Sequence, residues 1–277
     1  MTNSRVTAPF GRRAAVVRAV ERHGAYVSLH TIDAEGPRPT AGQFYMLQTA
    51  ECWGSGQDGR PYLPRALSFA RAVQLDGDLK LSFLLAEVGP GTARLAACEA
   101  GEQLLIAGPF GNGFDLDPNR WPLLVAGGIG LAPIVALDDE LRDLDGVRST
   151  ALVGMRDADR ARAADAYGLD HRLATEDGSA GHRGYVTELL ARELDAGRES
   201  TVYACGPPAM LEAVRALCAE RGVPSQLAME SGMACGFGAC YGCVVPTVDG
   251  YVRLCVDGPV LAGDRLETAL AIRAESS

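Results

Sequence analysis

Hydrophobic positions follow two different patterns in the two halves of the chain. Up to about Phe114, short apolar runs are separated by Gly, Pro and Asp. The clearest of these runs are Tyr26–Ile32, Gln43–Thr49, Leu67–Val73 and Leu79–Leu85. Runs of this length with turn residues between them predict strands, and a succession of such strands predicts a small antiparallel barrel.

From Trp121 onward, apolar strands alternate with helical segments. The expected strands are Leu123–Ala126, Thr150–Val153, His171–Ala174 and Thr201–Ala204, and the expected helices include Ala132–Leu144, Thr187–Leu194 and Pro208–Glu220. Such alternation predicts a mostly parallel sheet covered by helices. The expected fold is therefore multi-domain: an N-terminal antiparallel β-barrel at 1–114, an α/β parallel-sheet domain at 115–223, and a small C-terminal loop and hairpin domain at 224–277.

Composition narrows the class of protein. The chain has 277 residues, is 47% hydrophobic and 22% charged, and carries a net charge of −9. Because binding to phosphate backbones requires clustered Lys and Arg, this acidic balance argues against a nucleic-acid partner. The longest apolar run, Trp121–Leu137, is interrupted by glycines and prolines, so it predicts a strand, turn and helix, not a membrane span.

Four cysteines near the C-terminal end carry the strongest chemical signal. Cys235, Cys240 and Cys243 follow the spacing C-x4-C-x2-C, and Cys255 follows after eleven further residues. Plant-type ferredoxins hold a [2Fe–2S] cluster with thiolates at this spacing. Glycines between the thiols allow the positive φ angles that a tight loop needs. A zinc site or unrelated buried thiols are the alternatives, but zinc sites usually contain two C-x2-C pairs or histidines.

A hairpin accounts for the distant fourth cysteine. Segments 244–248 and 251–255 flank Asp249-Gly250, a two-residue turn signal. If these two residues form the turn, Val248 pairs with Tyr251, and Val244 pairs with Cys255. That register would place Cys255 beside Cys243, with paired Cβ atoms roughly 5 Å apart. Pro246 cannot donate a hydrogen bond, so its strand is expected at an edge.

The other cysteines are expected to be reduced. The basic N-terminal residues precede no long apolar segment, so we expect no signal peptide and a cytoplasmic location. Cys52, Cys98 and Cys218 are interpreted as packing residues. The four histidines show no ligand spacing.

Two glycine-rich turns are candidate sites for phosphorylated cofactors. Arg65-Ala66-Leu67-Ser68 lies on an expected strand, and Gly89-Pro90-Gly91-Thr92 opens a short helix with Thr92 as its expected N-cap. A helix start and a nearby Arg both favour a phosphate. In the second half, the turns at 127–130 and 205–207 follow strands, at the sheet edge where ligands bind. Cys205 could approach a bound ring or could simply fill a tight turn.

Together these motifs form a recognisable set. R-x-x-S at Arg65–Ser68, GG-x-G-x-x-P at Gly127–Pro133 and C-G-P-P-x-M at Cys205–Met210 resemble the ferredoxin–NADP reductase superfamily. Within it, Met229–Cys243 followed by Cys255–Val260 resembles the electron-transfer subunits of type 1B, NAD-dependent dihydroorotate dehydrogenase. The resemblance extends from about residue 12 to residue 266. Two features depart from the pattern: Ala66 replaces the usual proline after Arg65, and 53–59 is an additional Gly-rich stretch.

The resemblance implies cofactors and site residues. It assigns one FAD to the barrel, one [2Fe–2S] cluster to the four cysteines, and NAD as co-substrate to the α/β domain. The implied FAD residues are Arg65, Ala66, Leu67, Ser68, Leu84, Leu85, Ala86, Gly91 and Thr92. The implied NAD residues are Gly127, Gly128, Gly130, Gly206 and Pro207, with Cys205 as the catalytic residue beside the nicotinamide ring.

The resemblance also implies an activity and a partner. Dihydroorotate would be oxidised in a separate FMN-containing catalytic subunit, within a heterotetramer of two plus two. Electrons would pass through the [2Fe–2S] cluster and FAD to NAD+ in de novo pyrimidine biosynthesis. The alternative is a similar reductase serving a hydrogenase, a sulfite reductase or a ferredoxin-linked transhydrogenase. A zinc-stabilised binding module without redox chemistry is a third interpretation.

Overall fold

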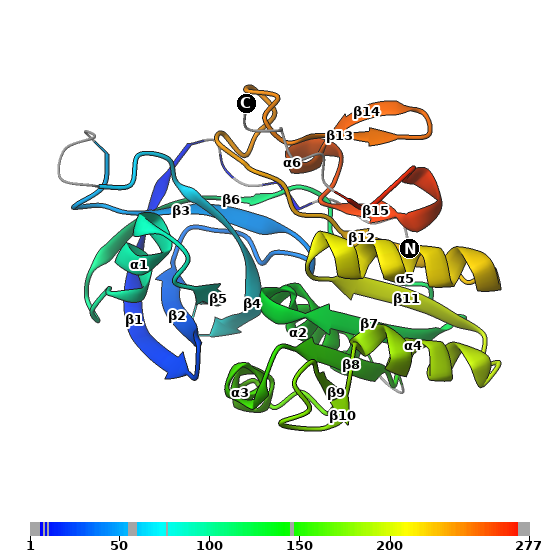
Figure 1. Cartoon of the computed structure of the whole chain (residues 1–277). Helices are drawn as coiled ribbons and strands as arrows, with labels where there is room; N and C mark the ends of the chain where they lie inside the picture. Colours follow the sequence, from blue (N-terminus) through cyan, green and yellow to red (C-terminus); the bar gives the residue numbers. More distant parts are fainter. Residues whose placement is uncertain are drawn as a thin grey trace, which may run out of the picture.

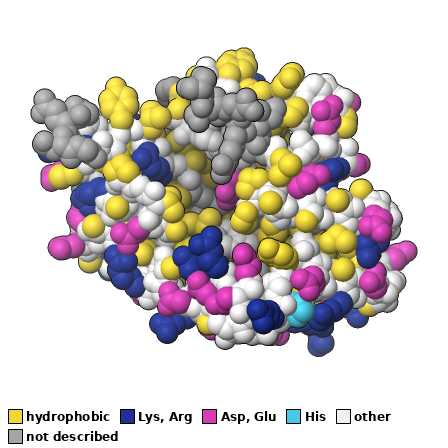
Figure 2. Space-filling model, viewed as in Figure 1, with side chains coloured by type: hydrophobic (Ala, Val, Ile, Leu, Met, Phe, Trp, Pro, Cys, Tyr) yellow, Lys and Arg dark blue, Asp and Glu magenta, His cyan; other side chains and the backbone are white. Residues whose placement is uncertain are grey.

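The computed structural model describes residues 6, 7 and 9 and the ranges 11–54, 60–75, 77–144 and 147–270. Most of the additional Gly-rich stretch, residues 55–59, lies outside the described residues. Within the described ranges, no helix is long and apolar enough to cross a membrane. On the face shown in Figure 2, Lys and Arg are interspersed with Asp and Glu and do not gather in one patch.

Six antiparallel strands close into the predicted barrel, on the left of Figure 1, in the order β1-β2-β5-β4-β3-β6. Their bounds are β1 Arg13–His23, β2 Tyr26–Asp33, β3 Phe44–Thr49, β4 Arg65–Leu75, β5 Asp78–Ala86 and β6 Gln103–Phe110. Large apolar side chains such as Tyr45 and Phe83 fill the interior, with ring centroids 5.6 Å apart. The short helix α1 (Pro90–Ala96) follows β5.

The second half forms a seven-stranded sheet in the order β10-β9-β8-β7-β11-β12-β15. All its pairings are parallel except that of β12 with β15. The strands are β7 Trp121–Gly127, β8 Thr150–Met155, β9 His171–Thr175, β10 His182–Arg183, β11 Ser200–Cys205, β12 Ser225–Ala228 and β15 Val260–Ala262. The helices are α2 Leu131–Arg142, α3 Ala158–Ala166, α4 Val186–Asp195 and α5 Pro208–Arg221. Because α2 packs on β4 and α3 on β1, these two helices join the sheet to the barrel.

The C-terminal segment is tied to both parts. Strands β12 and β15 lie beyond the predicted boundary at 223/224, yet they extend the α/β sheet. Between them the chain leaves the sheet to form the cysteine loop and a hairpin at the upper right of Figure 1. The division into three domains with these boundaries stays a prediction.

The predicted hairpin exists, but its predicted register is wrong. Strands β13 (Val244–Thr247) and β14 (Gly250–Arg253) pair Val244 with Arg253 and Thr247 with Gly250, two residues away from the expected pairing. The expected turn needs a positive φ at both central residues. Gly250 has a φ of 119°, but Asp249 is not among the described residues with positive φ, so Val248 and Asp249 form the turn instead.

Cys255 therefore does not lie on the second strand. It belongs to a short helical turn, α6 (Leu254–Asp257), that begins where β14 ends. The N–H of Leu254 donates to the carbonyl of Cys243 over 3.1 Å, which still brings the two cysteines together. Pro246 lies in a two-stranded sheet, where every strand is an edge, as its missing N–H requires.

Candidate functional site

The four C-terminal cysteines are arranged as two pairs. The Sγ atoms of Cys243 and Cys255 lie 3.3 Å apart, and both residues are buried. Cys235 lies beside Cys240, whose backbone N–H and thiol both lower the pKa of Cys235. Gly236 and Gly238 have φ angles of 80° and 90°, so the loop uses the left-handed backbone that glycine permits.

The surroundings of the loop favour the thiolate form of Cys235 and oppose the thiolate form of Cys255. Burial raises the pKa of Cys235, but the backbone N–H groups of Cys240, Phe237 and Ala239 and the Cys240 thiol lower it more, to about 6. Burial and then the neighbouring Cys243 raise the pKa of Cys255 to about 12. The Cys255 thiol therefore ionises at neutral pH only when a bound cation compensates its charge.

The pairing distinguishes between the candidate metal groups. A structural zinc site gathers four ligands around one ion. Two pairs of thiols suit two iron atoms, each held by two thiolates of a four-cysteine cluster site. The loop therefore fits a diiron cluster.

A cavity of about 320 Å³ lies between the barrel, the α/β sheet and the chain entering the cysteine loop. Eight of the predicted site residues line it: Arg65, Ala66, Leu67, Ser68, Leu84, Ala86, Thr92 and Cys205. The other predicted cofactor residues are not among its lining: Leu85, Gly91, Gly127, Gly128, Gly130, Gly206 and Pro207. Its size falls at the lower end of the range for small-molecule sites.

Arg65 is held at one side of this cavity by two neighbours. Its guanidinium lies over the Trp53 ring, 5.6 Å from the centroid. A Cβ atom on Gly91 would overlap the same guanidinium, so glycine at this position leaves room for Arg65 at the start of α1. The arrangement places one fixed positive charge beside the first turn of a helix, where an anion is favoured.

Thr92 is not the N-cap of α1, so that prediction is wrong. Gly89 is the N-cap, and Thr92 is the third helical residue. The Thr92 hydroxyl accepts the N–H groups of Val88 and Gly89, over 2.9 and 3.2 Å. The helix begins earlier than predicted because the fixed φ of Pro90 suits the first helical position.

The two glycine turns of the α/β half pack against each other. A Cβ atom on Gly130 would overlap the backbone of Cys205 and Gly206, and one on Gly127 would overlap the Met210 side chain. Gly128, with a φ of 54°, has only the Tyr26 hydroxyl within 4 Å of that position. Two of the three glycines therefore have a packing reason to lack a side chain. Burial raises the pKa of the Cys205 thiol, which consequently stays protonated at neutral pH.

The chain passes directly from the cavity to the first thiol. Met229, Glu230, Ser231 and Met233 line the cavity, and Cys235 is only two residues further on. A Cβ atom on Gly236 would overlap the Met46 side chain of β3, so the loop rests on the barrel. The cluster loop and the cavity thus share one segment of chain.

Comparison with known proteins places these features in a family. Residues 230–267 match the model for the iron–sulfur cluster binding domain of dihydroorotate dehydrogenase B, and residues 124–216 match the oxidoreductase NAD-binding domain. The dihydroorotate dehydrogenase B (NAD(+)) electron transfer subunit of Clostridium acetobutylicum is 37% identical over 81% of this chain and 85% of its own length. The chain belongs to this family of electron transfer subunits. The Clostridium perfringens subunit is 35% identical over 82% of this chain and 87% of its own length.

A solved structure of an NADH-dependent reduced ferredoxin–NADP oxidoreductase shares the fold. It covers 94% of this chain and 92% of its own, with a TM-score of 0.77 and 23% identity. The predicted family resemblance, the fold class and the assignment to the oxidoreductases are thereby confirmed. As an electron transfer subunit, the chain carries an iron–sulfur domain and an NAD-binding domain.

Sequence reasoning missed Glu230, which lines the cavity with Cys205. Burial raises the pKa of its carboxyl group. Its position five residues before the first cluster cysteine was the only available signal, and it does not indicate that the residue lines a cavity. The interpretation of Cys52 as a packing residue is wrong, because Cys52 is exposed, with a φ of 58°. Cys98 and Cys218 are buried, as expected.

Proposed function

We propose that this electron transfer subunit carries electrons from the catalytic subunit of dihydroorotate dehydrogenase, through a [2Fe–2S] cluster and one FAD, to NAD+ in de novo pyrimidine biosynthesis. The observation that carries the proposal is the shared segment, in which residues 229–233 line the cavity immediately before the first cluster cysteine. Two redox groups held by one short stretch of chain would lie close enough to exchange electrons.

The FAD is proposed to occupy the cavity between barrel and sheet. When bound, it would exchange electron pairs with a nicotinamide and single electrons with the cluster. Arg65, held beside Gly91 at the start of α1, would bind its diphosphate. Residues 66–68 of β4 and 84–86 of β5 would line the ring system, with Thr92 holding the loop before α1 in place.

The nicotinamide is proposed to enter from the α/β side. Gly127, Gly128, Gly130, Gly206 and Pro207 would form its binding turns. Cys205 would lie beside the ring as a buried neutral thiol, whose role is to shape the site and exclude water. We propose NAD as the co-substrate, in line with the family.

The partner is proposed to be the FMN-containing catalytic subunit, in a heterotetramer of two plus two in the cytoplasm. Three aromatic side chains of the cysteine loop and its hairpin are exposed: Phe237 is 60%, Tyr241 65% and Tyr251 77% exposed. Exposed apolar side chains that gather in one region are typical of interaction surfaces, and aromatic residues are enriched at interface centres. This surface would bring the cluster next to the catalytic subunit.

The experiment is reconstitution with the catalytic subunit encoded by the same genome. The purified complex should form orotate from dihydroorotate only when both subunits and NAD+ are present. Tyr251→Ala should weaken assembly and leave FAD content and iron content unchanged. The control is Tyr185→Ala, which removes a 64% exposed tyrosine from the N-cap of α4 and should not affect assembly. If the catalytic subunit forms no complex while a hydrogenase or sulfite reductase subunit does, the pyrimidine assignment fails.

A further inference from the structure

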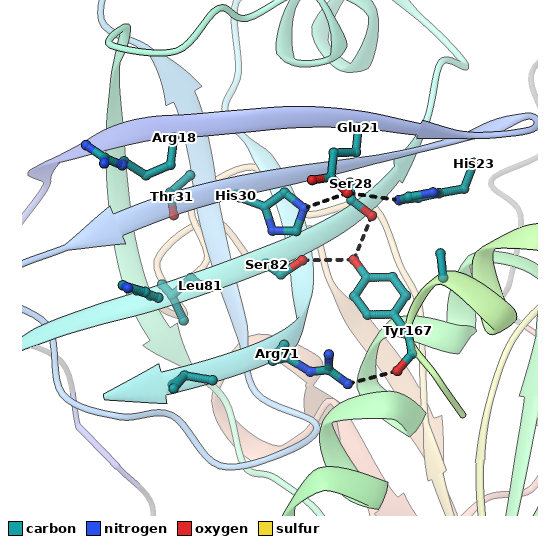
Figure 3. A pocket seen from close by; sticks show the side chains of 13 residues that line it. Arg18, Glu21, His23, Ser28, His30, Thr31, Arg71, Leu81, Ser82 and Tyr167 are labelled. Carbon is teal, nitrogen blue, oxygen red and sulfur yellow. Dashed lines mark hydrogen bonds and ion pairs between the residues drawn. The ribbon is translucent and has the colours of Figure 1, made fainter. Parts of the chain in front are cut away.

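A second cavity, of about 300 Å³, lies on the outer side of the barrel (Figure 3). Strands β1, β2, β4 and β5 form its floor, and Tyr167, at the C-terminal end of α3, closes one side. It shares no lining residue with the cavity proposed for FAD. Nothing in the electron-transfer function requires it.

Two irregularities in the barrel strands occur at this cavity. The pairing of β1 with β2 shifts between Val17 and Ala19, which makes Arg18 the extra residue of a bulge. The pairing of β4 with β5 shifts between Phe69 and Arg71. Bulges redirect side chains and are over-represented beside functional sites. Here they bring Arg18 and Arg71 into the lining of the same cavity.

The lining is positively charged although the chain as a whole is acidic. Arg18, Arg71 and Lys80 face a single carboxylate, Glu21, in a chain of net charge −9. Arg71 is already paired with Asp139 of α2, over 2.7 Å. Neither Arg18 nor Lys80 has an ion-pair partner within the described ranges. Two unpaired cations on different strands therefore border the cavity.

A histidine adds an unused polar group. The Nε2 atom of His30 is buried and has no hydrogen-bond partner in the described part of the chain. A charged neighbour, the Glu21 carboxylate, is 3.8 Å away, which is too long for a direct hydrogen bond. Buried polar atoms are nearly always satisfied, so an unsatisfied one that lines a cavity indicates a missing partner.

We propose that this cavity binds a small phosphate monoester. A doubly charged phosphate matches the two unpaired cations, since charge-assisted hydrogen bonds to Arg and Lys are the usual means of holding it. Inorganic phosphate alone would leave most of the volume empty. The remaining wall includes Val73, Leu81, Ala166 and the Tyr167 ring, which suit the apolar or cyclic body of an ester.

The position gives such a ligand a means of regulation. The Tyr167 hydroxyl is 2.9 Å from those of Ser28 and Ser82, so the cavity lies where α3 docks on the barrel. A bound ester would contact both parts and strengthen their docking. The same two strands, β4 and β5, line the proposed FAD cavity at their other ends, so both sites depend on one pair of strands.

The test is a titration of the complete FAD-bound protein with phenyl phosphate and with inorganic phosphate, followed by calorimetry. NAD+ is kept at saturation so that the phosphate sites of both cofactors are filled. Phenyl phosphate should bind wild-type protein more tightly than inorganic phosphate. Arg18→Gln/Lys80→Gln should weaken that binding about tenfold or more. Arg148→Gln/Arg162→Gln removes two exposed arginines outside the cavity and should leave it unchanged.

A second variant guards against an indirect effect of removing the cations. Val73→Glu places a carboxylate at a lining position that is 45% exposed, and should also weaken phenyl phosphate binding. No binding to the wild-type protein would overturn the proposal, as would equal binding by the two double variants. If inorganic phosphate binds as tightly as phenyl phosphate, the assignment to a monoester is overturned. None of these outcomes depends on electron transfer.

Discussion

The docking of α3 on the barrel depends on one phenol group. Tyr167 is 6% exposed, and its hydroxyl lies 2.9 Å from the hydroxyls of Ser28 (1% exposed) and Ser82 (4% exposed). Tyr167→Phe keeps the ring and removes only the oxygen. Both serines then lose this hydrogen bond at positions that are almost fully buried, beside the second cavity.

The expected cost follows from these unpaired groups. A buried hydroxyl without a partner costs about 1–3 kcal/mol. Two such groups would together cost about 2–6 kcal/mol. We expect a loss in the lower half of that range, roughly 2–4 kcal/mol, because a serine hydroxyl can rotate toward other acceptors. In a chain of this size the loss corresponds to a fall in Tm of roughly 5–10 °C.

The assay is thermal unfolding of the FAD-bound protein, with two comparisons. Tyr251→Phe, at a position 77% exposed, should change stability by less than about 0.5 kcal/mol. The triple variant Ser28→Ala/Ser82→Ala/Tyr167→Phe contains none of the three hydroxyls and should be more stable than Tyr167→Phe alone. The reasoning is refuted if Tyr167→Phe unfolds at the wild-type temperature, or if the triple variant is the least stable of the set.

Three further predictions concern the cluster, the flavin and pH. Cys255→Ser should abolish the visible absorbance of the cluster and lower the iron content, whereas Cys98→Ser, which removes a buried thiol of the barrel half, should retain both. Arg65→Gln should weaken FAD binding about tenfold or more, measured by flavin release on dilution, and Arg60→Gln should not. Burial raises the pKa of Glu140 to about 7, so the folded state holds this proton more tightly than the unfolded state. Stability should therefore fall as the pH rises from about 4.5 to about 7. Glu140→Gln should show a smaller fall in Tm over this pH range than the wild-type protein. An equal fall in Tm for the two proteins would contradict the raised pKa of Glu140.

Much of the fold was predictable because its signals are local. Apolar runs between turn residues predict the barrel strands, and the strand–helix alternation after Trp121 predicts the parallel sheet. The cysteine spacing is a local signal too, because a loop of glycines and thiols has few other uses. Nothing in these patterns depends on which distant residues come into contact.

Local signals were less reliable where two nearby geometries compete. Asp249-Gly250 is a strong turn signal, yet the pairing is displaced by two residues, because Asp249 does not take the positive φ that the expected turn needs. The conclusion that Cys255 lies near Cys243 held for a different reason, the short helix after β14 and its backbone hydrogen bond. The predicted N-cap at Thr92 was wrong for a similar local reason, because α1 begins earlier, with Pro90 as its first residue.

By itself, the sequence determined most barrel strands, the strand–helix alternation after Trp121, the family and the cysteines of the loop, because hydrophobic period, turn chemistry and residue spacing are written along the chain. Only the tertiary structure decided which groups share a cavity. Glu230 and Cys205 line one cavity, and Arg18 and Lys80 line another, through strand pairings and bulges that bring together residues far apart in the chain. A bulge inserts one residue into a strand and so changes the direction in which the neighbouring side chains point. The position of a bulge depends on packing throughout the barrel, so the local sequence does not specify it.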